Sequence, residues 1–391
     1  MIKGNQPGSW AESTVKVRLP DIARRTLAGN DFPPPVVERL RALIGEIPAG
    51  PIRPVRDSGP DVPDWEGYTR PYLGQNWLDA PWFFVETYFY RRILEASGYF
   101  GGDLPGYDPF RFEKTRGRAA SQNAVRALCS RVQSWLDSRS PQKALPCLLH
   151  IDLWGNQADL SLWPVDDETA ASNAPPDPGA EHLLVDHAPA VSHYLANQER
   201  GRVDILLDNA GLELLVDLQL AGFLLAAGLA AEVHLHCKAH PTFVSDAIVQ
   251  DVREAIQSLA ADEHPAARAC GQRLQTALEN RTLHLHAHFF WNSPLAFWDA
   301  PADLHAELSR AALIISKGDA NYRRLLGDRL WPFDTPFEQI MAYTPAPLLA
   351  LRVFKAELAA GLSPAVVEKV SKKDPHWLTN GRWGVIQWTG T

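Results

Sequence analysis

The chain has 391 residues, of which 46% are hydrophobic and 21% are charged, as in an ordinary globular protein large enough for two structural parts. Its formal net charge of −8 provides no basic field that would favour nucleic acid or an anionic membrane surface. The amino terminus lacks an apolar signal core and no apolar run is long enough to span a bilayer, so we expect a cytoplasmic protein without a membrane segment.

The first part of the chain, residues 1–145, has the pattern of a mainly helical region. Apolar residues recur at helical spacing after Arg18 and again from Val36 to Ile47. Aromatic side chains follow the same spacing from Ala80 to Leu94, and we interpret them as a buried helix face in preference to an aromatic binding pocket.

From residue 146 to residue 391, short apolar runs alternate with longer helical patterns. This alternation predicts βαβ units around a mostly parallel sheet with helices on both faces. The acidic stretch of residues 164–180, rich in Pro and Ala, is expected to be a loop insertion. The predicted strands are Cys147–Leu153, Val203–Leu207, Glu232–Cys237, Thr282–His288, Leu313–Ser316, Leu348–Val353 and Val385–Trp388.

Several common catalytic motifs are missing from the sequence. It contains no GxGxxG, no GxxxxGK[ST], no HExxH and no GxSxG. Dinucleotide binding, P-loop hydrolysis, zincin chemistry and nucleophile-elbow hydrolysis therefore lack their usual sequence support.

Polar side chains instead follow four of the predicted strands. One strand runs directly into Asp208-Asn209, and the next reaches Asp246 after a short loop. The strand AALIIS continues into Lys317 and Arg323, and LLALRVFK supplies Arg352 and Lys355. In a parallel sheet all four ends lie at one edge, which is where ligands bind in open α/β folds.

Two carboxylates and a carboxamide at this edge have the chemistry of a hard-metal site. Oxygen ligands suit Mg²⁺ or Mn²⁺, and so few protein ligands leave positions open for water and a substrate oxygen. Nearby Lys and Arg match phosphate oxygens, and the helix after Gly211 adds backbone donors. Glu213, in the first turn of that helix, is positioned to hold a water.

Each of these residues also has an ordinary structural interpretation. Asp208-Asn209 and Asp246 are placed where helix caps occur. Lys317 and Arg323 are equally compatible with solvated loop cations, and Arg352 and Lys355 with surface charges. The site hypothesis rests on four clusters at four strand ends, and Asp217 is expected to be structural.

The histidines allow a second metal hypothesis. His234, His236 and His240 follow one predicted strand, while His284, His286 and His288 alternate along another. Residues two apart share a strand face, so zinc binding is conceivable. The four cysteines form no CxxC pair and the spacing matches no known zinc pattern. We therefore expect these histidines to be ordinary side chains of the sheet faces.

The sequence resembles the metal-dependent damage-control phosphatases, in the branch whose human member has also been described as a protein-glutamate O-methyltransferase. The resemblance runs in order through residues 15–390. It is carried by APWFFVETYFYRRIL, LWGNQADLSL, LLDNAGLELLVDL, HPTFVSD, SKGDANYRRLLGD and GVIQW. It implies an α/β fold: a three-layer α/β/α sandwich with a Rossmann-like, mostly parallel sheet, preceded by a helical region.

The resemblance also implies roles for individual residues. The metal ligands would be Asp208, Asn209 and Asp246, binding Mn²⁺, Mg²⁺, Co²⁺ or Ni²⁺. From its place after a predicted strand, we expect Lys317 to be a further catalytic residue that stabilises charge on the phosphoryl group. The family's R-T-x-K signature here reads Arg352-Val353-Phe354-Lys355, which keeps both cations and loses the hydroxyl. The expected substrate-binding residues are Glu213, Asp319, Asn321, Tyr322, Arg323, Arg352, Lys355 and Asn156.

The expected function is hydrolysis of small phosphorylated metabolites, with sugar phosphates such as fructose 1-phosphate or fructose 6-phosphate as the substrate class. The sequence does not distinguish attack by a metal-held water from attack by Asp208 or Asp246. Two alternatives are an S-adenosylmethionine-dependent carboxyl methyltransferase, for which no Gly-rich cofactor loop is present, and a non-catalytic sugar-phosphate sensor. The sequence gives no indication of oligomeric state.

Overall fold

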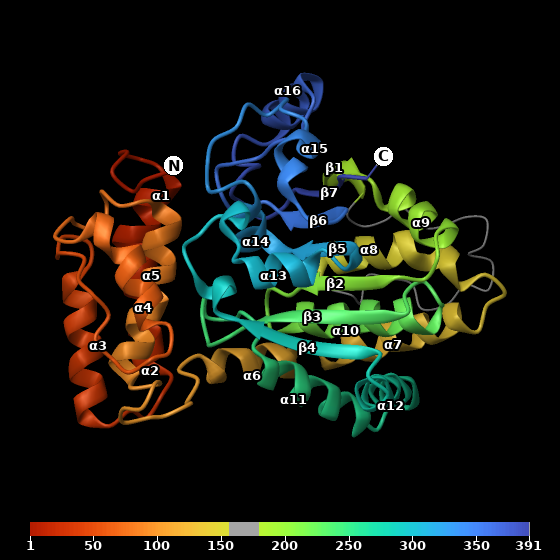
Figure 1. The fold of residues 1–391 in the computed structure, drawn as a ribbon, viewed down its shortest axis with the longest axis horizontal. Coiled ribbons are helices and arrows are strands. Elements are labelled where there is room, and N and C mark those ends of the chain that lie inside the picture. Colours follow the sequence, from red (N-terminus) through yellow and green to blue (C-terminus); the bar gives the residue numbers. More distant parts are fainter. Residues whose placement is uncertain (156–179, 391) are drawn as a thin grey trace.

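The computed structural model of the chain describes residues 1–155 and 180–390 (Figure 1). Asn156 and residues 164–179 of the expected loop insertion lie outside this part. The strands are β1 (Leu183–Asp186), β2 (Arg202–Leu206), β3 (Glu232–Lys238), β4 (Leu283–His288), β5 (Ala311–Lys317), β6 (Leu348–Val353) and β7 (Gly384–Trp388).

The helices divide between an amino-terminal group and the layers around the sheet. The amino-terminal helices are α1 (Trp10–Ser13), α2 (Leu19–Ala28), α3 (Pro34–Glu46), α4 (Val62–Thr69) and α5 (Trp82–Ser97). The next are α6 (Arg111–Ala120), α7 (Gln122–Leu136), α8 (Leu145–Trp154), α9 (Ala188–Asn197), α10 (Leu212–Ala226), α11 (Val249–Ala260) and α12 (Pro265–Glu279). The last are α13 (Ala302–Leu308), α14 (Gly318–Leu325), α15 (Phe337–Ile340) and α16 (Pro364–Lys373).

All seven strands belong to one sheet, in the order β1-β7-β6-β5-β2-β3-β4. Strands β2 to β6 pair in parallel, with Val203 opposite Val233 on one side and Leu313 on the other. Strand β7 runs antiparallel to β6 and parallel to β1. The predicted mostly parallel sheet is confirmed, and the carboxyl ends of β2, β3, β5 and β6 meet at one edge.

Helices cover both faces of the sheet, as the predicted three-layer α/β/α arrangement requires. Val203 and Ile205 of β2 pack with residues of α7, α8 and α10–α12. Leu206, on the opposite face of the same strand, packs with residues of α13–α16. This alternation follows from the period of two in a strand, and it gives each face its own apolar core.

The prediction of a strand over Cys147–Leu153 is wrong, because these residues belong to helix α8. Pro146 stands in the first turn of the helix, a position that proline favours. The helix packs against α9, α10 and β6, so it is buried on several sides. Apolar residues therefore lie all around it, and the sequence shows no helical periodicity. The edge strand β1 comes later in the chain and was not predicted from the sequence.

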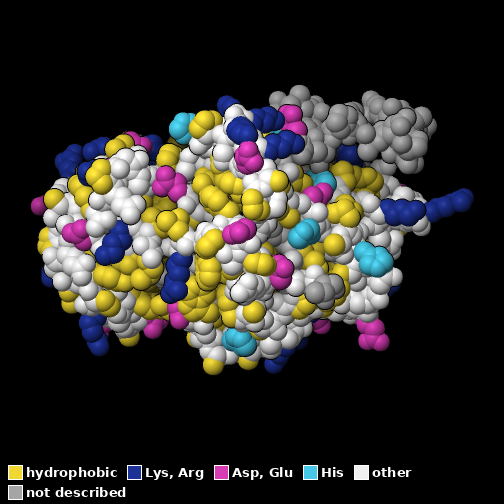
Figure 2. All heavy atoms as spheres, turned by 90° about the horizontal axis from the view of Figure 1, so that it is seen from above, with side chains coloured by type: hydrophobic (Ala, Val, Ile, Leu, Met, Phe, Trp, Pro, Cys, Tyr) yellow, Lys and Arg dark blue, Asp and Glu magenta, His cyan; other side chains and the backbone are white. Residues whose placement is uncertain are grey.

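The amino-terminal helices form a body beside the sheet layers (Figure 1). Its core is built from α2, α3 and α5 with the segments between them, and the aromatic run predicted to be buried lies in α5. Within the described residues, no helix combines the length and apolarity that crossing a bilayer requires. On the face shown in Figure 2, acidic and basic side chains are interspersed among apolar ones.

Candidate functional site

The loops that follow β2 and β3 bring Asp208, Asn209 and Asp246 together. Asn209 and Asp246 form an isolated antiparallel bridge. The backbone N–H of Ala247 donates to the carbonyl of Asp208 at 2.7 Å. Backbone pairing thus aligns the two loops and brings the three side chains together at one end of the sheet.

The carboxylates of this cluster are poorly neutralised. Burial and the negative charges of Asp246 and Glu213 raise the pKa of Asp208 well above its ordinary value. Burial also raises the pKa of Asp246, although the Lys238 ammonium, 3.2 Å from Oδ2, opposes this. Among the side chains that the structure describes, Lys238 is the one cation at ion-pair distance from these three carboxylates. The cluster therefore favours additional positive charge.

Asn209 links the carboxylates through its side-chain amide. Its Nδ2 donates to Asp208 Oδ2 at 3.0 Å and to Glu213 Oε2 at 2.8 Å, while Oδ1 accepts from the Ser245 hydroxyl. Oδ2 of Asp246 is buried, and its contact with the Lys238 ammonium at 3.2 Å is an ion pair without hydrogen-bond geometry. These oxygens fit a hard divalent cation, and a cation between the carboxylates would favour the amide turned with Oδ1 toward it.

Neither aspartate acts as a helix cap. Gly211 is the N-cap of α10 and makes no side-chain capping bond. Helix α11 begins after Ile248, whose N–H donates to Asp251 at 3.0 Å. The structural interpretation of Asp208 and Asp246 as caps is therefore wrong, which leaves both carboxylates for another role.

Gly318 allows the start of α14 to approach Asp208 closely. Its backbone has φ +84°, and a Cβ at this position would lie 1.9 Å from Asp208 Oδ2. Only glycine meets both conditions without strain. The backbone of Gly318, directly after β5, therefore lies beside the Asp208 carboxylate.

Lys317, expected to contact the phosphoryl group, lies in a buried ion-pair cluster. Its Nζ is 2.9 Å from Asp152 Oδ1 and 3.2 Å from Asp217 Oδ1, and it donates to the Asp152 carbonyl at 2.8 Å. Burial opposes protonation, but the two aspartates raise the pKa of Lys317 above its ordinary value. The ammonium ties α8 and α10 to the start of α14.

The two cations at the end of β6, Arg352 within the strand and Lys355 just after it, lie near Asp319. Nε of buried Arg352 donates to Asp319 Oδ1 at 2.8 Å, and Nη1 donates to the Leu358 carbonyl at 2.7 Å. The backbone N–H of Lys355 donates to the same Asp319 oxygen at 3.2 Å. The side chain of Lys355 is exposed, and its positive charge opposes the rise in the pKa of Asp208.

The remaining residues of α14 are turned toward the protein interior. Nδ2 of Asn321 donates to the carbonyls of Lys317 at 2.9 Å and Leu207 at 3.2 Å. Tyr322 donates from its hydroxyl to Gln387 at 2.7 Å. These bonds fix the ends of β2, β5 and β7 relative to one another.

Arg323 joins the site edge to the helical region. Its guanidinium pairs with Glu86 of α5, donates to Asp328 at 2.8 Å and lies 3.7 Å above the Trp82 ring. Nη2 is buried and has no hydrogen-bond partner. The structure thus places Arg323 between the two parts of the protein.

Residues 14–370 match the model of the family described as "Damage-control phosphatase ARMT1-like domain". The chain belongs to this family. It is 33% identical to the zebrafish (Danio rerio) protein named Damage-control phosphatase ARMT1, covering 98% of this chain and 95% of the relative. The rat (Rattus norvegicus) protein of that name is 34% identical, covering 98% of this chain and 97% of the relative. The human (Homo sapiens) protein is 32% identical, covering 100% of this chain and 98% of the relative.

A solved structure also aligns over most of the chain. It is the crystal structure of a DUF89 family protein from Pyrococcus horikoshii, with 13% identity, a TM-score of 0.48, and coverage of 95% of this chain and 96% of that one.

Sequence reasoning did not assign a role to Lys238 or Gly318 in this damage-control phosphatase family member. Lys238 ends β3 and reaches both Asp246 and the Leu207 carbonyl, at 3.1 Å from the latter. The signal in the sequence for Lys238 was a lysine at the end of an apolar strand, next to the predicted site edge. For Gly318 the signal was its place at a strand-to-helix junction.

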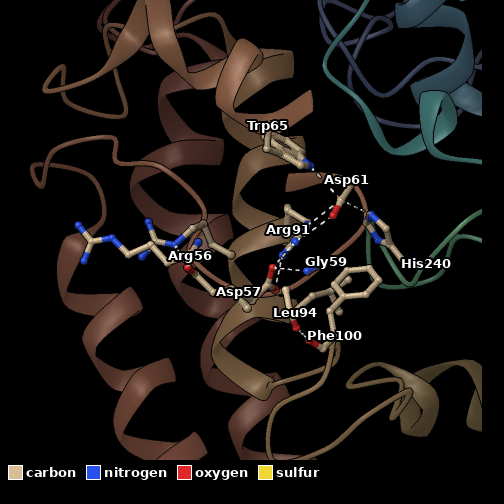
Figure 3. Close-up of polar contacts among 12 residues, drawn as sticks. Arg56, Asp57, Gly59, Asp61, Trp65, Arg91, Leu94, Phe100 and His240 are labelled. Atoms are coloured by element: carbon tan, nitrogen blue, oxygen red, sulfur yellow. Dashed lines mark hydrogen bonds and ion pairs between the residues drawn. The ribbon is translucent and has the colours of Figure 1, made fainter. Parts of the chain in front are cut away.

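The loop that carries Asp246 is also held from the helical region (Figure 3). His240 Nε2 lies 3.6 Å from Asp61 Oδ2, and Asp61 accepts from Arg91 Nε at 2.8 Å. Phe243 packs on Tyr90 with ring centroids 4.9 Å apart. The backbone of Phe243 has φ +46°, a strained conformation that such packing must hold in place.

Replacing Asp61 with asparagine should destabilise the protein by about 3 kcal/mol at pH 7, because it leaves buried Arg91 short of a partner. Burial would raise the pKa of Asp61, but His240 and Arg91 hold it well below its ordinary value. Its stabilising effect is therefore complete above the unfolded pKa of about 4 and is lost as the pH falls below it.

Urea unfolding at pH 7, 5 and 3 measures this effect. The gap between wild type and Asp61→Asn should narrow on acidification, whereas Asp64→Asn, an exposed position in α4, should match wild type throughout. A gap that is absent at pH 7, or that widens in acid, contradicts the role of Asp61.

Proposed function

We propose that the chain is a divalent-metal-dependent phosphatase acting on small phosphorylated metabolites, with sugar phosphates such as fructose 1-phosphate or fructose 6-phosphate as the substrate class. The observation that carries the proposal is the buried group of Asp208, Asn209 and Asp246, in which burial and mutual repulsion raise the pKa of Asp208 despite the nearby Lys238 ammonium. Its relatives are named damage-control phosphatases, which supports the same reaction class.

In this proposal Asp208, Asn209 and Asp246 hold Mn²⁺, Mg²⁺, Co²⁺ or Ni²⁺ through oxygen atoms. The bound cation supplies the positive charge that stabilises a phosphoryl group during transfer. Glu213 faces the same group through the Asn209 amide and is positioned to accept a hydrogen bond from the attacking water. Lys238 keeps Asp246 oriented.

Lys355 is the residue we assign to the phosphoryl oxygens, because its side chain is exposed and its backbone N–H is bonded to Asp319 at the start of α14. Asp319 is assigned to substrate hydroxyls, with Arg352 fixing its carboxylate. We assign Lys317, Asn321, Tyr322 and Arg323 positioning roles, because their polar atoms are engaged within the protein.

A cavity beside the start of α10 fits a small phosphorylated ligand. It is lined by Arg25 of α2, by Asn30 in the segment after that helix, and by residues of α6 that include Arg116. Gly117, also in its wall, comes so close to α10 that an added Cβ would lie 4.0 Å from Cα of Gly211. Exposed Arg116 offers donors for phosphate oxygens, whereas Arg25 is paired with Asp21 and Glu113 and the Asn30 amide donates to the carbonyls of Thr26 and Pro109.

The test is release of phosphate from p-nitrophenyl phosphate and a sugar-phosphate panel by metal-stripped protein, with Mg²⁺, Mn²⁺, Co²⁺ or Ni²⁺ added singly. We expect release only with metal, abolished in Asp208→Asn and unchanged in Asp303→Asn, an exposed position in α13. Tight sugar-phosphate binding without turnover would favour a sensor. Methyl transfer from S-adenosylmethionine that persists in EDTA would favour a methyltransferase.

A further inference from the structure

One face of the β3–β4 pair carries histidines where the opposite face carries apolar residues. Val233 and Leu235 point into the core formed with α10–α12. In register, His234 lies opposite His284 and His236 opposite His286, on the other face. Helix α13, through Glu307, reaches this histidine face, which remains partly open to solvent.

We propose that Glu232, His234 and His284 form a second metal site, which binds a divalent transition ion such as Zn²⁺. Glu232 Oε2 lies 3.2 Å from His234 Nε2 and 3.8 Å from His284 Nε2. One ligand atom from each residue lies within 4.8 Å of the other two. The two imidazoles are stacked, with centroids 4.2 Å apart and planes at 28°.

These separations suit a zinc coordination sphere. Zinc bonds of about 2.1 Å in tetrahedral geometry place ligand atoms about 3.4 Å apart, so only small side-chain shifts are required. Two imidazole nitrogens and one carboxylate oxygen match the preference of Zn²⁺ and its neighbours for borderline ligands. Three protein ligands leave a fourth position for water.

Two further contacts point to a ligand at this place. Nε2 of His284 is buried yet has no hydrogen-bond partner, although it lies beside the Glu232 carboxylate. His234 Nδ1 lies 2.8 Å from His286 Nε2. When His286 Nε2 accepts this hydrogen bond, the proton of His234 is on Nδ1, which leaves Nε2 free to coordinate the ion. Metal-bound histidines commonly donate a hydrogen bond from the nitrogen that does not bind the metal.

A second trio on the same face, His234, His286 and Glu307, is less suited to a cation. Oε1 of Glu307 already accepts from Arg202 Nη1 at 2.6 Å, so a guanidinium charge lies beside the ligand atom. The contact between His234 Nδ1 and His286 Nε2 also occupies the nitrogens that this trio would use. The structure therefore favours the trio that contains Glu232.

The proposed zinc site is separate from the oxygen-ligand group. Glu232 begins β3, whereas Lys238, which contacts Asp246, ends it. Six residues of strand span about 20 Å. An ion at this end would join edge strand β4 to β3 and so stabilise the sheet edge. The inference does not depend on phosphatase activity.

The experiment is titration of full-length Asp246→Asn protein, which weakens the oxygen-ligand group, with Zn²⁺ by calorimetry. We expect one ion per chain. Adding His284→Gln or Glu232→Gln should weaken binding at least tenfold, whereas His305→Gln, an exposed histidine in α13, should have no effect. Both ligand positions are partly exposed, so these variants should fold.

A second readout is the thermal midpoint. Zn²⁺ should raise it in the Asp246→Asn protein and in His305→Gln, and should raise it less or not at all in His284→Gln, because only the folded state presents the assembled trio. Unchanged stoichiometry and affinity in both His284→Gln and Glu232→Gln would overturn the site. Unchanged metal-dependent phosphate release in a single His284→Gln variant would confirm that the two sites are independent.

Discussion

Replacing Asp246 with alanine is expected to reduce metal-dependent phosphate release by about 10³-fold or more while the protein remains folded. The side chain is only 1% exposed, and its Oδ2 contacts the Lys238 ammonium at 3.2 Å without hydrogen-bond geometry. Without this carboxylate, Asp208 and Asn209 keep too little charge to hold a divalent cation. Lys238 loses its ion-pair partner but keeps its hydrogen bond to the Leu207 carbonyl and the nearby charge of Asp208, and the repulsion between Asp246 and Asp208 is removed, so the metal-free fold should remain stable.

Phosphate release is measured with saturating Mn²⁺ and a sugar phosphate, alongside circular dichroism and urea unfolding. Asp246→Asn, which preserves shape and removes charge, should lose activity to a similar extent, whereas Asp303→Asn in α13 should not. Turnover at the wild-type rate in a well-folded, metal-loaded Asp246→Ala protein would remove Asp246 from the metal site.

Replacing Gly318 with alanine should both destabilise the protein, by about 2 kcal/mol, and lower phosphate release by about 100-fold. A non-glycine residue at φ +84° costs about 1–2 kcal/mol. The added Cβ would also lie 1.9 Å from Asp208 Oδ2, so the carboxylate or α14 must move. A displacement of about 1 Å near reacting groups is enough for a loss of this size.

Urea unfolding and phosphate release test the two effects separately. Gly222→Ala, inside α10, is the matched control. Its added Cβ would lie 3.5 Å from Leu274 Cδ2, an ordinary contact, so the variant should be as stable as wild type or slightly more stable. If Gly318→Ala unfolds like wild type and releases phosphate at the wild-type rate, then the close approach of Gly318 to Asp208 is not required.

The main elements of the sheet were readable from the sequence because they depend on local pattern. Five runs of alternating or continuous apolar residues correspond to β2–β6, and the short GVIQW run to β7. Asp208 directly after one apolar run, and Asp246 in the short loop after the next, pointed to the carboxyl edge, because parallel strands end together.

The roles of the cations could not be read from the sequence in the same way. Lys317 and Arg323 stand in the chain as close to the site edge as Lys355 does. The fold supplies Asp152 and Asp217 from α8 and α10 to the first, and Glu86 from α5 to the second. A buried cation binds whichever carboxylate shares its low-dielectric surroundings, and those partners are 100 or more residues away in the chain.

The sequence by itself determined the fold class, the strand ends that carry carboxylates and the family. Only the tertiary structure decided that Cys147–Leu153 is a helix, because an apolar run buried on several sides has no period to read. The tertiary structure likewise brought Glu232 beside His234 and His284, since residues on different strands meet only through the register of the sheet.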